Sequence, residues 1–470
     1  MAKVKNADWI TGKKERISYY SYFLGQNAIY TMVSTFLTTY LLFQGLDPAK
    51  SGLVMLAVKV WDAVNNTVFG VVFDSVRFKS GKKFLPWIKV STFLIPVTTV
   101  LIYSIPRGLD ETMKLAWFAV AYILWDTAYT LCDVPIYGIV TAMTQRIDER
   151  TSLLSFKSIW AGVGSGIAMI LGTVLVGEKV GLNFGLAAVI VALIAFATML
   201  PVNFNVKERF KSESEEEFTV KRMFTYLFGN KYLLIYYWGF LVQGSLAVGP
   251  PLVLLVSYYM FKNSQFSLII LALSVLPMLF AALFVPKLLK RIDKMRLYLI
   301  CNAAVIVISV IIWLVGYKSM VTFALLSALR SAPAAIVGVT MFMFTPDCAE
   351  YGIFETGIDA KGITFAIQTF MAKLTGAISG SLGLILLKLY DWTPVKAESF
   401  EDLQRLAISQ SDRAMGGLWF VYNAVPIIGM VAAFIIWLFY KLRDKDVQIM
   451  ADANCGKISR DEALILLNRK

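Results

Sequence analysis

Runs of about 20 apolar residues recur along this chain, and they constrain its fold more than any other feature. Twelve such runs can be counted, the first at residues 19–42 and the last at 416–440. A run of this length crosses the hydrocarbon core of a bilayer as a single helix. Charged residues make up only 16% of the chain, against about 25% in a typical soluble domain. The sequence therefore predicts an all-α membrane protein with twelve transmembrane helices.

The basic residues are distributed unevenly between the predicted loops. With both termini in the cytoplasm, 31 of the 45 Lys and Arg residues fall in cytoplasmic segments. Membrane proteins carry this excess of positive charge on their cytoplasmic side, so the net charge of +13 does not indicate a nucleic-acid partner. We predict a monomeric protein integral to the plasma (cytoplasmic) membrane of a bacterium, in contact with membrane lipid, with both termini cytoplasmic.

A charged segment that includes KERFKSESEEEF divides the predicted spans six and six. The basic loop DSVRFKSGKK after the second span has a counterpart, PKLLKRIDKMR, after the eighth. Transporters built from repeats show weak symmetry of this kind, although cytoplasmic loops are basic in general. We predict an N-terminal six-helix half at 1–202, a central cytoplasmic loop at 203–230, a C-terminal six-helix half at 231–440 and a cytoplasmic tail at 441–470.

Several kinds of catalytic machinery are missing from the sequence. No G-x-x-x-x-G-K-[ST] motif occurs, so a Walker-type phosphate site is not expected. The chain contains no His, which excludes a Ser–His–Asp triad and a His-ligated metal. Its four cysteines have no metal-binding spacing, and we expect no disulfide. We predict a protein that is not an enzyme and has no cofactor, and whose transport is passive or coupled to an ion gradient.

Four polar residues interrupt the second predicted span. Lys59, Asp62, Asn65 and Asn66 lie at i, i+3, i+6 and i+7, on one broad helical face. Ionisable residues inside a membrane are costly and usually functional. Three interpretations are open. A carboxylate among carboxamide oxygens suits Na⁺, and the same carboxylate can instead carry a proton. In the third, Lys59 and Asp62 only neutralise each other's charge. We predict a site for a cation here.

The fourth predicted span carries one polar stripe on an otherwise apolar helix. The stripe has the spacing i, i+3, i+4, i+7 and i+11 and consists of Asp126, Tyr129, Thr130, Asp133 and Tyr137. A carboxylate accepts two hydroxyl hydrogen bonds at once, and a tyrosine ring offers an apolar face to a pyranose, so the combination suits a sugar. Ordinary packing also explains the two tyrosines, and the prediction of a sugar site therefore depends most on Asp133.

Polar residues on three other spans add to this set. Asn27 lies on the first span. Gln368 and Lys373 lie on the eleventh, and because Lys373 has no acidic partner in its own helix, we expect one on the second or fourth span. Arg330 on the tenth span has three interpretations: it binds a carboxylate of the substrate, pairs with an internal Asp, or extends to the membrane surface.

At these residues the chain resembles the glycoside–pentoside–hexuronide:cation symporters, the melibiose-permease-like branch of the major facilitator superfamily. The matching segments are VWDAVNNTVFG, SGKKFLPWI, YTLCDVPIYG, IDERTSLLSFK, DCAEYGIFETG and IQTFMAKL. Each segment alone is a weak signal, but together they are specific and cover nearly the whole chain. The resemblance implies the major facilitator fold and the import of a sugar together with H⁺ or Na⁺.

The resemblance also implies roles in the cation site. Asp62 matches the principal carboxylate of that site in the family, with Thr130 as a nearby oxygen ligand. Lys373 matches a lysine that links the cation and sugar sites, and Lys59 stands where the family often has an arginine. Asn66 is a departure, because melibiose-permease-like members have a second Asp there. This loss of a negative charge weakens the case for Na⁺ and leaves H⁺ at least as well supported.

For the sugar site, the resemblance points to the fourth span. Asp133 matches the sugar-binding carboxylate, with Tyr129 and Tyr137 as its aromatic neighbours. Lys157 is similar to a basic residue that reaches the sugar. Asn27 is the second departure, because it stands where an Asp binds sugar in melibiose-permease-like members, so the substrate need not be a galactoside.

Together these observations predict a cation-coupled symporter that imports a glycoside, a pentose or a uronide by alternating access. Two alternatives remain: a carrier of another organic solute or a lipid on the same fold, and a membrane sensor that does not transport. The predicted site residues are, for the cation, Asp62, Asn65, Asn66 and Thr130; for the substrate, Asn27, Asp126, Tyr129, Asp133, Tyr137, Lys157 and Gln368; and for coupling, Lys59, Arg330 and Lys373.

Overall fold

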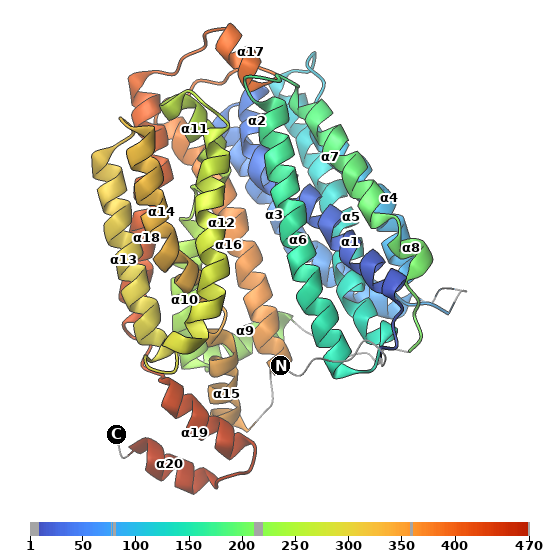
Figure 1. Ribbon diagram of the computed structural model, residues 1–470, viewed down its shortest axis with the longest axis vertical. Helices are drawn as coiled ribbons and strands as arrows, with labels where there is room; N and C mark the ends of the chain where they lie inside the picture. Colours follow the sequence, from blue (N-terminus) through green and yellow to red (C-terminus); the bar gives the residue numbers. More distant parts are fainter. Residues whose placement is uncertain (1–8, 77, 79–80, 211–219, 358–360, 469–470) are drawn as a thin grey trace. The chain divides into compact units, whose positions relative to one another are not determined.

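The computed structural model describes residues 9–76, 78, 81–210, 220–357 and 361–468, and most of these residues are helical (Figure 1). Helical residues make up most of each of the twelve predicted spans, and the span at 232–260 is interrupted at residues 246–249. Nine helical stretches in the described residues are long and apolar enough to cross a membrane. The same residues contain a single β-bridge, between Gln44 and Lys396, and no longer β pairing. The predicted all-α fold class is confirmed.

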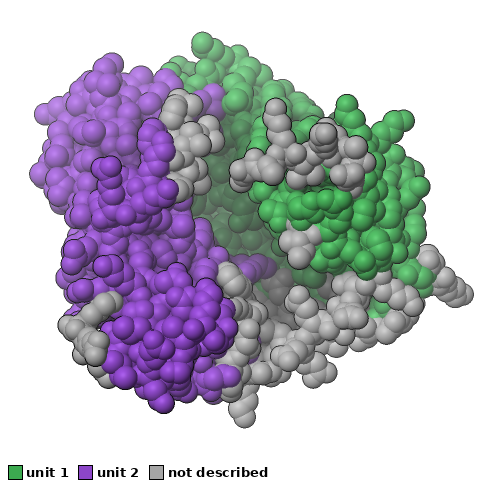
Figure 2. All heavy atoms as spheres, turned by 60° about the horizontal axis from the view of Figure 1, so that its bottom comes forward, with its two compact units in different colours: residues 1–215, 251–265, 384–414 green, residues 216–250, 266–383, 415–470 purple. Residues whose placement is uncertain are grey.

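The chain folds into two compact units, coloured separately in Figure 2. Unit 1 contains Met1–Glu215, Pro251–Gln265 and Leu384–Ala414, and unit 2 contains Glu216–Pro250, Phe266–Gly383 and Met415–Lys470. The division follows the two predicted halves, except that two segments from the second half of the sequence belong to unit 1. The exact boundaries predicted for the halves stay predictions.

Unit 1 is built mainly from the first six predicted spans. Its elements there are α1 (Lys13–Thr31), the π-helical η2 (Met32–Phe36), α2 (Leu37–Phe43), α3 (Pro48–Ser75), α4 (Leu85–Ile102), α5 (Glu111–Met143), α6 (Ile147–Val176), α7 (Phe184–Met199) and α8 (Val202–Asn205). Two helix starts are capped by side chains: Asp110 accepts from Met113 N at 3.0 Å, and Asn183 accepts from Leu186 N at 2.8 Å. The π-helical turn is supported by the Tyr103 hydroxyl, which donates to Met32 O at 2.7 Å.

Helices α1 and α6 pack closely because α6 presents a glycine where the two backbones approach. Gly164 is buried, and a Cβ added to it would overlap the carbonyl oxygen of Leu24 on α1. Gly162, two residues earlier on the same helix, is exposed, and a Cβ there would meet no atom within 4 Å. Close approach of two membrane helices generally requires such small residues.

Replacing Gly164 by Ala is therefore expected to destabilise the protein by about 1–3 kcal/mol, since the added methyl forces α1 and α6 apart. The matched change Gly162→Ala adds the same methyl in open space, and it should be neutral or stabilising by up to about 1 kcal/mol through helix propensity. Thermal unfolding of the purified variants in one detergent measures both effects. Equal melting temperatures for the two variants would contradict the close contact at Gly164.

Two segments from the second half of the sequence pack onto the end of unit 1 that is predicted to be external. They carry η3 (Pro250–Leu252), α11 (Val253–Phe261) and α17 (Phe400–Arg405). Ala397 N donates to Phe43 O at 3.0 Å, beside the β-bridge. Lys388 Nζ lies 2.7 Å from Asp47 Oδ2. Backbone pairing and an ion pair therefore join these segments to the helices of the first half.

Unit 2 contains the remaining membrane helices and the tail. Its elements are α9 (Val220–Gly229), α10 (Lys231–Ser245), α12 (Phe266–Leu288), α13 (Lys294–Val315), α14 (Met320–Met341), α15 (Phe344–Thr356), α16 (Lys361–Leu389), α18 (Asp412–Trp437), α19 (Asp444–Asn454) and α20 (Arg460–Asn468), with the ends of α16 and α18 reaching into unit 1. Its core is strongly aromatic: Trp437 lies edge-on to Tyr298 at 4.8 Å between ring centroids, and its indole N–H donates to Tyr236 O at 3.2 Å.

The described part of the predicted tail, 441–468, forms two helices, α19 and α20. Helix α19 packs against α15. Asp444 N donates to Asp293 Oδ2 at 3.0 Å, and Lys294 N donates back to Asp444 Oδ2 at 2.8 Å. The start of α13 and the start of α19 therefore bind each other through reciprocal hydrogen bonds, which fixes the tail on unit 2.

Candidate functional site

Most of the predicted site residues belong to unit 1. The residues placed there are Asn27 on α1, Lys59, Asp62, Asn65 and Asn66 on α3, Asp126, Tyr129, Thr130, Asp133 and Tyr137 on α5, and Lys157 on α6. Unit 2 holds Arg330 on α14 and Gln368 and Lys373 on α16. The side chain of Asn66 lies outside the described residues, so its predicted role stays a prediction.

A buried polar cluster forms where α3 packs against α5. Asn65 is 1% exposed, and its Nδ2 donates to Asp126 Oδ2 at 3.2 Å and to Thr130 Oγ1 at 3.1 Å. Lys59 interacts electrostatically with Asp62 and, more weakly, with Asp126. The structure thus joins Asn65 and Thr130, two residues predicted for the cation, to Asp126, which the sequence analysis placed in the substrate site. Lys59 lies near both Asp62 and Asp126.

The composition of this cluster suits a monovalent cation. With Asp62 and Asp126 ionised and Lys59 protonated, these three side chains carry a net charge of −1. Asn65 uses its amide N–H groups in the two hydrogen bonds, which leaves its carbonyl oxygen as an acceptor. Carboxylate, hydroxyl and amide oxygens are the ligands of hard cations, and a carboxylate alone can carry a proton.

A second group of polar residues surrounds Asp133, seven residues further along α5. Gln26 on α1 is 2% exposed, and its Nε2 donates to Asp133 Oδ1 at 3.1 Å. Its Oε1 is buried and accepts no hydrogen bond from the described residues. Lys157 on α6 interacts electrostatically with Asp133, and its Nζ lies 3.6 Å from the centroid of the Tyr137 ring. A carboxylate, a free amide oxygen, an ammonium group and an aromatic face therefore converge here.

Tyr30 on α1 connects the two groups. Its hydroxyl interacts electrostatically with Asp133 and with Asp62. Its ring lies 5.8 Å from that of Tyr129, which stacks on Trp125 at 5.1 Å. Both carboxylates therefore lie near one tyrosine, beside an aromatic column on α5.

Three of these residues were not predicted as site residues: Gln26, Tyr30 and Trp125. Gln26 and Tyr30 lie one helical turn apart on the first span, so a polar spacing of i, i+4 was the available signal. Asn27, which was predicted, instead donates its Nδ2 to Phe23 O of its own helix at 2.9 Å. Trp125 carried no signal, because an aromatic residue in an apolar span is ordinary.

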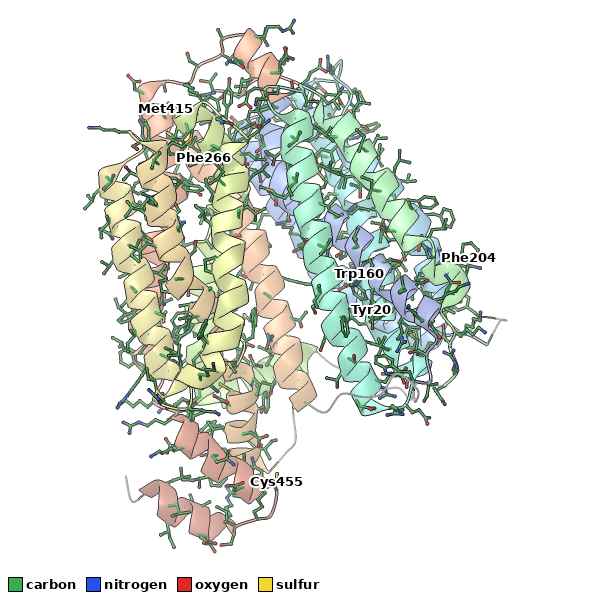
Figure 3. All side chains as sticks on the ribbon, viewed as in Figure 1. Tyr20, Trp160, Phe204, Phe266, Met415 and Cys455 are labelled. Carbon is green, nitrogen blue, oxygen red and sulfur yellow. The ribbon has the colours of Figure 1, made fainter. Side chains whose placement is uncertain are left out.

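More aromatic side chains lie between α1 and α6 near the Asp133 group. Figure 3 shows Tyr20 and Trp160 next to each other, with ring centroids 6.4 Å apart. Phe156, the residue before Lys157, lies 5.8 Å from Tyr20. An aromatic surface therefore continues along α6 from the level of Lys157.

The predicted residues of unit 2 are polar groups on two membrane helices. Gln368 has a buried Oε1 that accepts no hydrogen bond within the described part of the chain. Arg330 is half-buried and interacts electrostatically with Tyr422. Lys373 is exposed in this structure. The pairing predicted for it would join two units, and it stays a prediction.

Residues 18–444 match the family described as MFS/sugar transport protein. The chain belongs to this family. The resemblance noted from the six sequence segments is therefore confirmed. Membership of the MFS/sugar transport protein family makes the protein a polytopic membrane transporter and not an enzyme.

Curated relatives extend over nearly the whole chain. The isoprimeverose transporter of Lactiplantibacillus pentosus is 25% identical over 451 residues, which cover 93% of this chain and 90% of that protein. The glucuronide carrier protein homolog of Escherichia coli (strain K12) is 23% identical over 442 residues, covering 90% and 91%. Among solved structures, the nucleoside transporter NupG matches with a TM-score of 0.68 and 12% identity, covering 91% of this chain and 100% of that one. This likeness supports the major facilitator fold of two six-helix halves.

Proposed function

We propose that the protein imports a glycoside, a pentose or a uronide together with one H⁺ or Na⁺ by alternating access, across the cytoplasmic membrane of a bacterium and with both termini inside. The observation that carries this proposal is the arrangement on α5, where the Asp126 cluster and the Asp133 group lie two helical turns apart and share Tyr30 as a neighbour. This proximity gives the binding of an ion a direct route to change the affinity for a sugar.

The cation is proposed to bind between α3 and α5, at Asp62, Asn65, Asp126 and Thr130. In this arrangement Asp126 supplies the second carboxylate that Asn66 no longer provides. Lys59 offsets one negative charge, so a single monovalent cation or proton neutralises the rest. This charge balance supports coupling to one ion per sugar. It does not favour Na⁺ over H⁺.

The sugar is proposed to bind at Asp133. Its carboxylate accepts hydroxyl hydrogen bonds, and Gln26 Oε1 offers a further acceptor. Tyr137, 47% exposed, offers an aromatic face on which Lys157 lies. The ammonium group also gives a uronide carboxylate a partner, in keeping with a substrate range that includes acidic sugars. Lys373, Gln368 and Arg330 are proposed to contribute from unit 2.

Uptake into proteoliposomes tests this function. The purified protein would be reconstituted and offered a panel of labelled glycosides, pentoses and uronides under an inward H⁺ gradient, an inward Na⁺ gradient, or neither. We expect concentrative uptake of at least one sugar under one gradient only, which also identifies the ion. No gradient-dependent uptake of any sugar would overturn the proposal and favour a carrier of another solute or a sensor.

A further inference from the structure

Unit 1 has a half-open cavity of about 560 Å³ at the end where residues 384–414 pack onto the first half of the sequence. This volume falls within the range of roughly 300–1,000 Å³ that is usual for small-molecule sites. Tyr40, Tyr103 and Phe184 provide aromatic wall, and charged side chains from both halves of the sequence complete it. The cavity is separate from the residues proposed to bind the cation and the sugar.

The acidic residues of the cavity wall are already paired with arginines. Glu398 forms an ion pair with Arg107. Asp402 binds Arg405 at 2.6 Å, and this hydrogen bond lowers the pKa of Asp402, which keeps it ionised at neutral pH. The two carboxylates are thus matched by two guanidinium groups, and neither is left to balance another cation.

The other two charged residues of the cavity wall are the lysines Lys114 and Lys396. Lys114 on α5 is only 7% exposed, and its Nζ donates to Gln44 O at 3.0 Å. An ammonium group has three N–H donors, and the described residues supply no second acceptor for it. Lys396 is exposed and comes from the second half of the sequence. Neither lysine forms an ion pair within the described part of the chain, so the wall presents two ammonium groups that its carboxylates do not neutralise.

We propose that this cavity binds an oxyanion group, a carboxylate, sulfonate or phosphate, between Lys114 and Lys396, and that the bound anion strengthens the contact between residues 384–414 and the first half. An anion there supplies the counter-charge that Lys114 lacks and gives its unused N–H groups acceptors. The aromatic wall leaves room for an apolar or sugar-like remainder of the ligand. Either a free anion or the headgroup of an anionic lipid has this chemistry.

The second part of the proposal rests on the proposed transport function. In the proposed alternating access, we take the backbone pairing between residues 395–397 and 42–44 to separate when the site opens to the outside. Lys114 belongs to the first half of the sequence and Lys396 to the segment 384–414 that packs against it. Separation of the two segments therefore divides the anion site. A ligand that binds only the joined state shifts the equilibrium toward it.

Binding is tested with the full-length protein in nanodiscs of neutral phosphatidylcholine. Inorganic phosphate is titrated by calorimetry at constant ionic strength. We expect saturable binding that Lys396→Gln weakens by about tenfold or more and Lys396→Arg restores. Lys179→Gln is the matched control, because Lys179 is exposed in the same unit and lies outside the cavity wall. No phosphate binding, or equal binding by Lys396→Gln and the wild type, overturns the site.

The effect on the contact is tested by cysteine labelling in proteoliposomes. Ala397 is 6% exposed beside Phe43, so an A397C side chain in a C455S background reacts with an external impermeant maleimide only when the contact opens. We expect phosphate to slow this labelling in neutral lipid. Equal slowing by phosphatidylglycerol without phosphate assigns the anion to a lipid headgroup. An unchanged labelling rate despite measured phosphate binding overturns the effect on the contact. Failed sugar uptake would contradict the proposed transport function and leave the phosphate titration and the labelling result intact.

Discussion

Asp62→Asn is expected to abolish concentrative sugar uptake while leaving sugar exchange across the membrane close to the wild type. Asn has the shape of Asp without its charge, and it resembles the ion-bound or protonated carboxylate. The substitution should therefore remove the need for the ion without blocking movement of the loaded carrier. Lys59 keeps Asp126 as a counter-ion, so the change does not leave a buried ammonium group alone.

The size of this effect follows from the driving force. One cation moved through a potential of about 100 mV provides roughly 2.3 kcal/mol, which supports accumulation of about fifty-fold. The variant should reach a ratio of about one under the same potential. Counterflow with the sugar identified in the uptake panel measures exchange. Asp391→Asn removes an exposed carboxylate of the same unit and serves as the control. Retained accumulation in Asp62→Asn would contradict the cation site.

The positions of the membrane helices were predictable because the length of an apolar run is enough to identify a transmembrane helix. An apolar run of about 20 residues has few alternatives to a transmembrane helix, and helical residues make up most of all twelve runs. The packing of residues 384–414 onto unit 1 was not predictable. It depends on contacts such as Lys388 with Asp47, which join residues hundreds of positions apart and leave no local pattern. The π-helical turn at Met32–Phe36 likewise has no apolar periodicity that marks it.

The candidate site was predictable to the level of a helix face. Spacing on the second and fourth spans placed Asp62, Asn65 and Thr130 on polar faces, and the structure brings Asn65 and Thr130 together. Spacing does not show which residue of a neighbouring helix each one meets. That depends on the register between α3 and α5, and this register puts Asp126 against Asn65. The sugar-site role predicted for Asp126 is therefore replaced in our proposal by a role in the cation site.

Asp133→Asn is expected to weaken sugar binding by roughly 10- to 150-fold, because hydrogen bonds to a charged group contribute about 1.5–3 kcal/mol. The fold should persist, since an Asn side-chain oxygen still accepts the hydrogen bond from Gln26 that Asp133 accepts now. Equilibrium binding of the sugar to the purified protein, at saturating cation, measures the loss. Thermal unfolding of the same sample separates lost affinity from lost structure.

Asp126→Asn is the informative partner of this variant, because Asp126 lies two turns away on the same helix and faces the Asn65 cluster. At saturating cation it should bind sugar with nearly the wild-type affinity, whereas the cation concentration needed for half-maximal binding should rise. Removing one carboxylate leaves the cluster without net negative charge, so the attraction for the cation falls while the acceptors around Asp133 are unchanged. If both variants lose sugar affinity equally at saturating cation, then the two groups on α5 form one site, and Asp126 belongs with the sugar as the sequence analysis placed it.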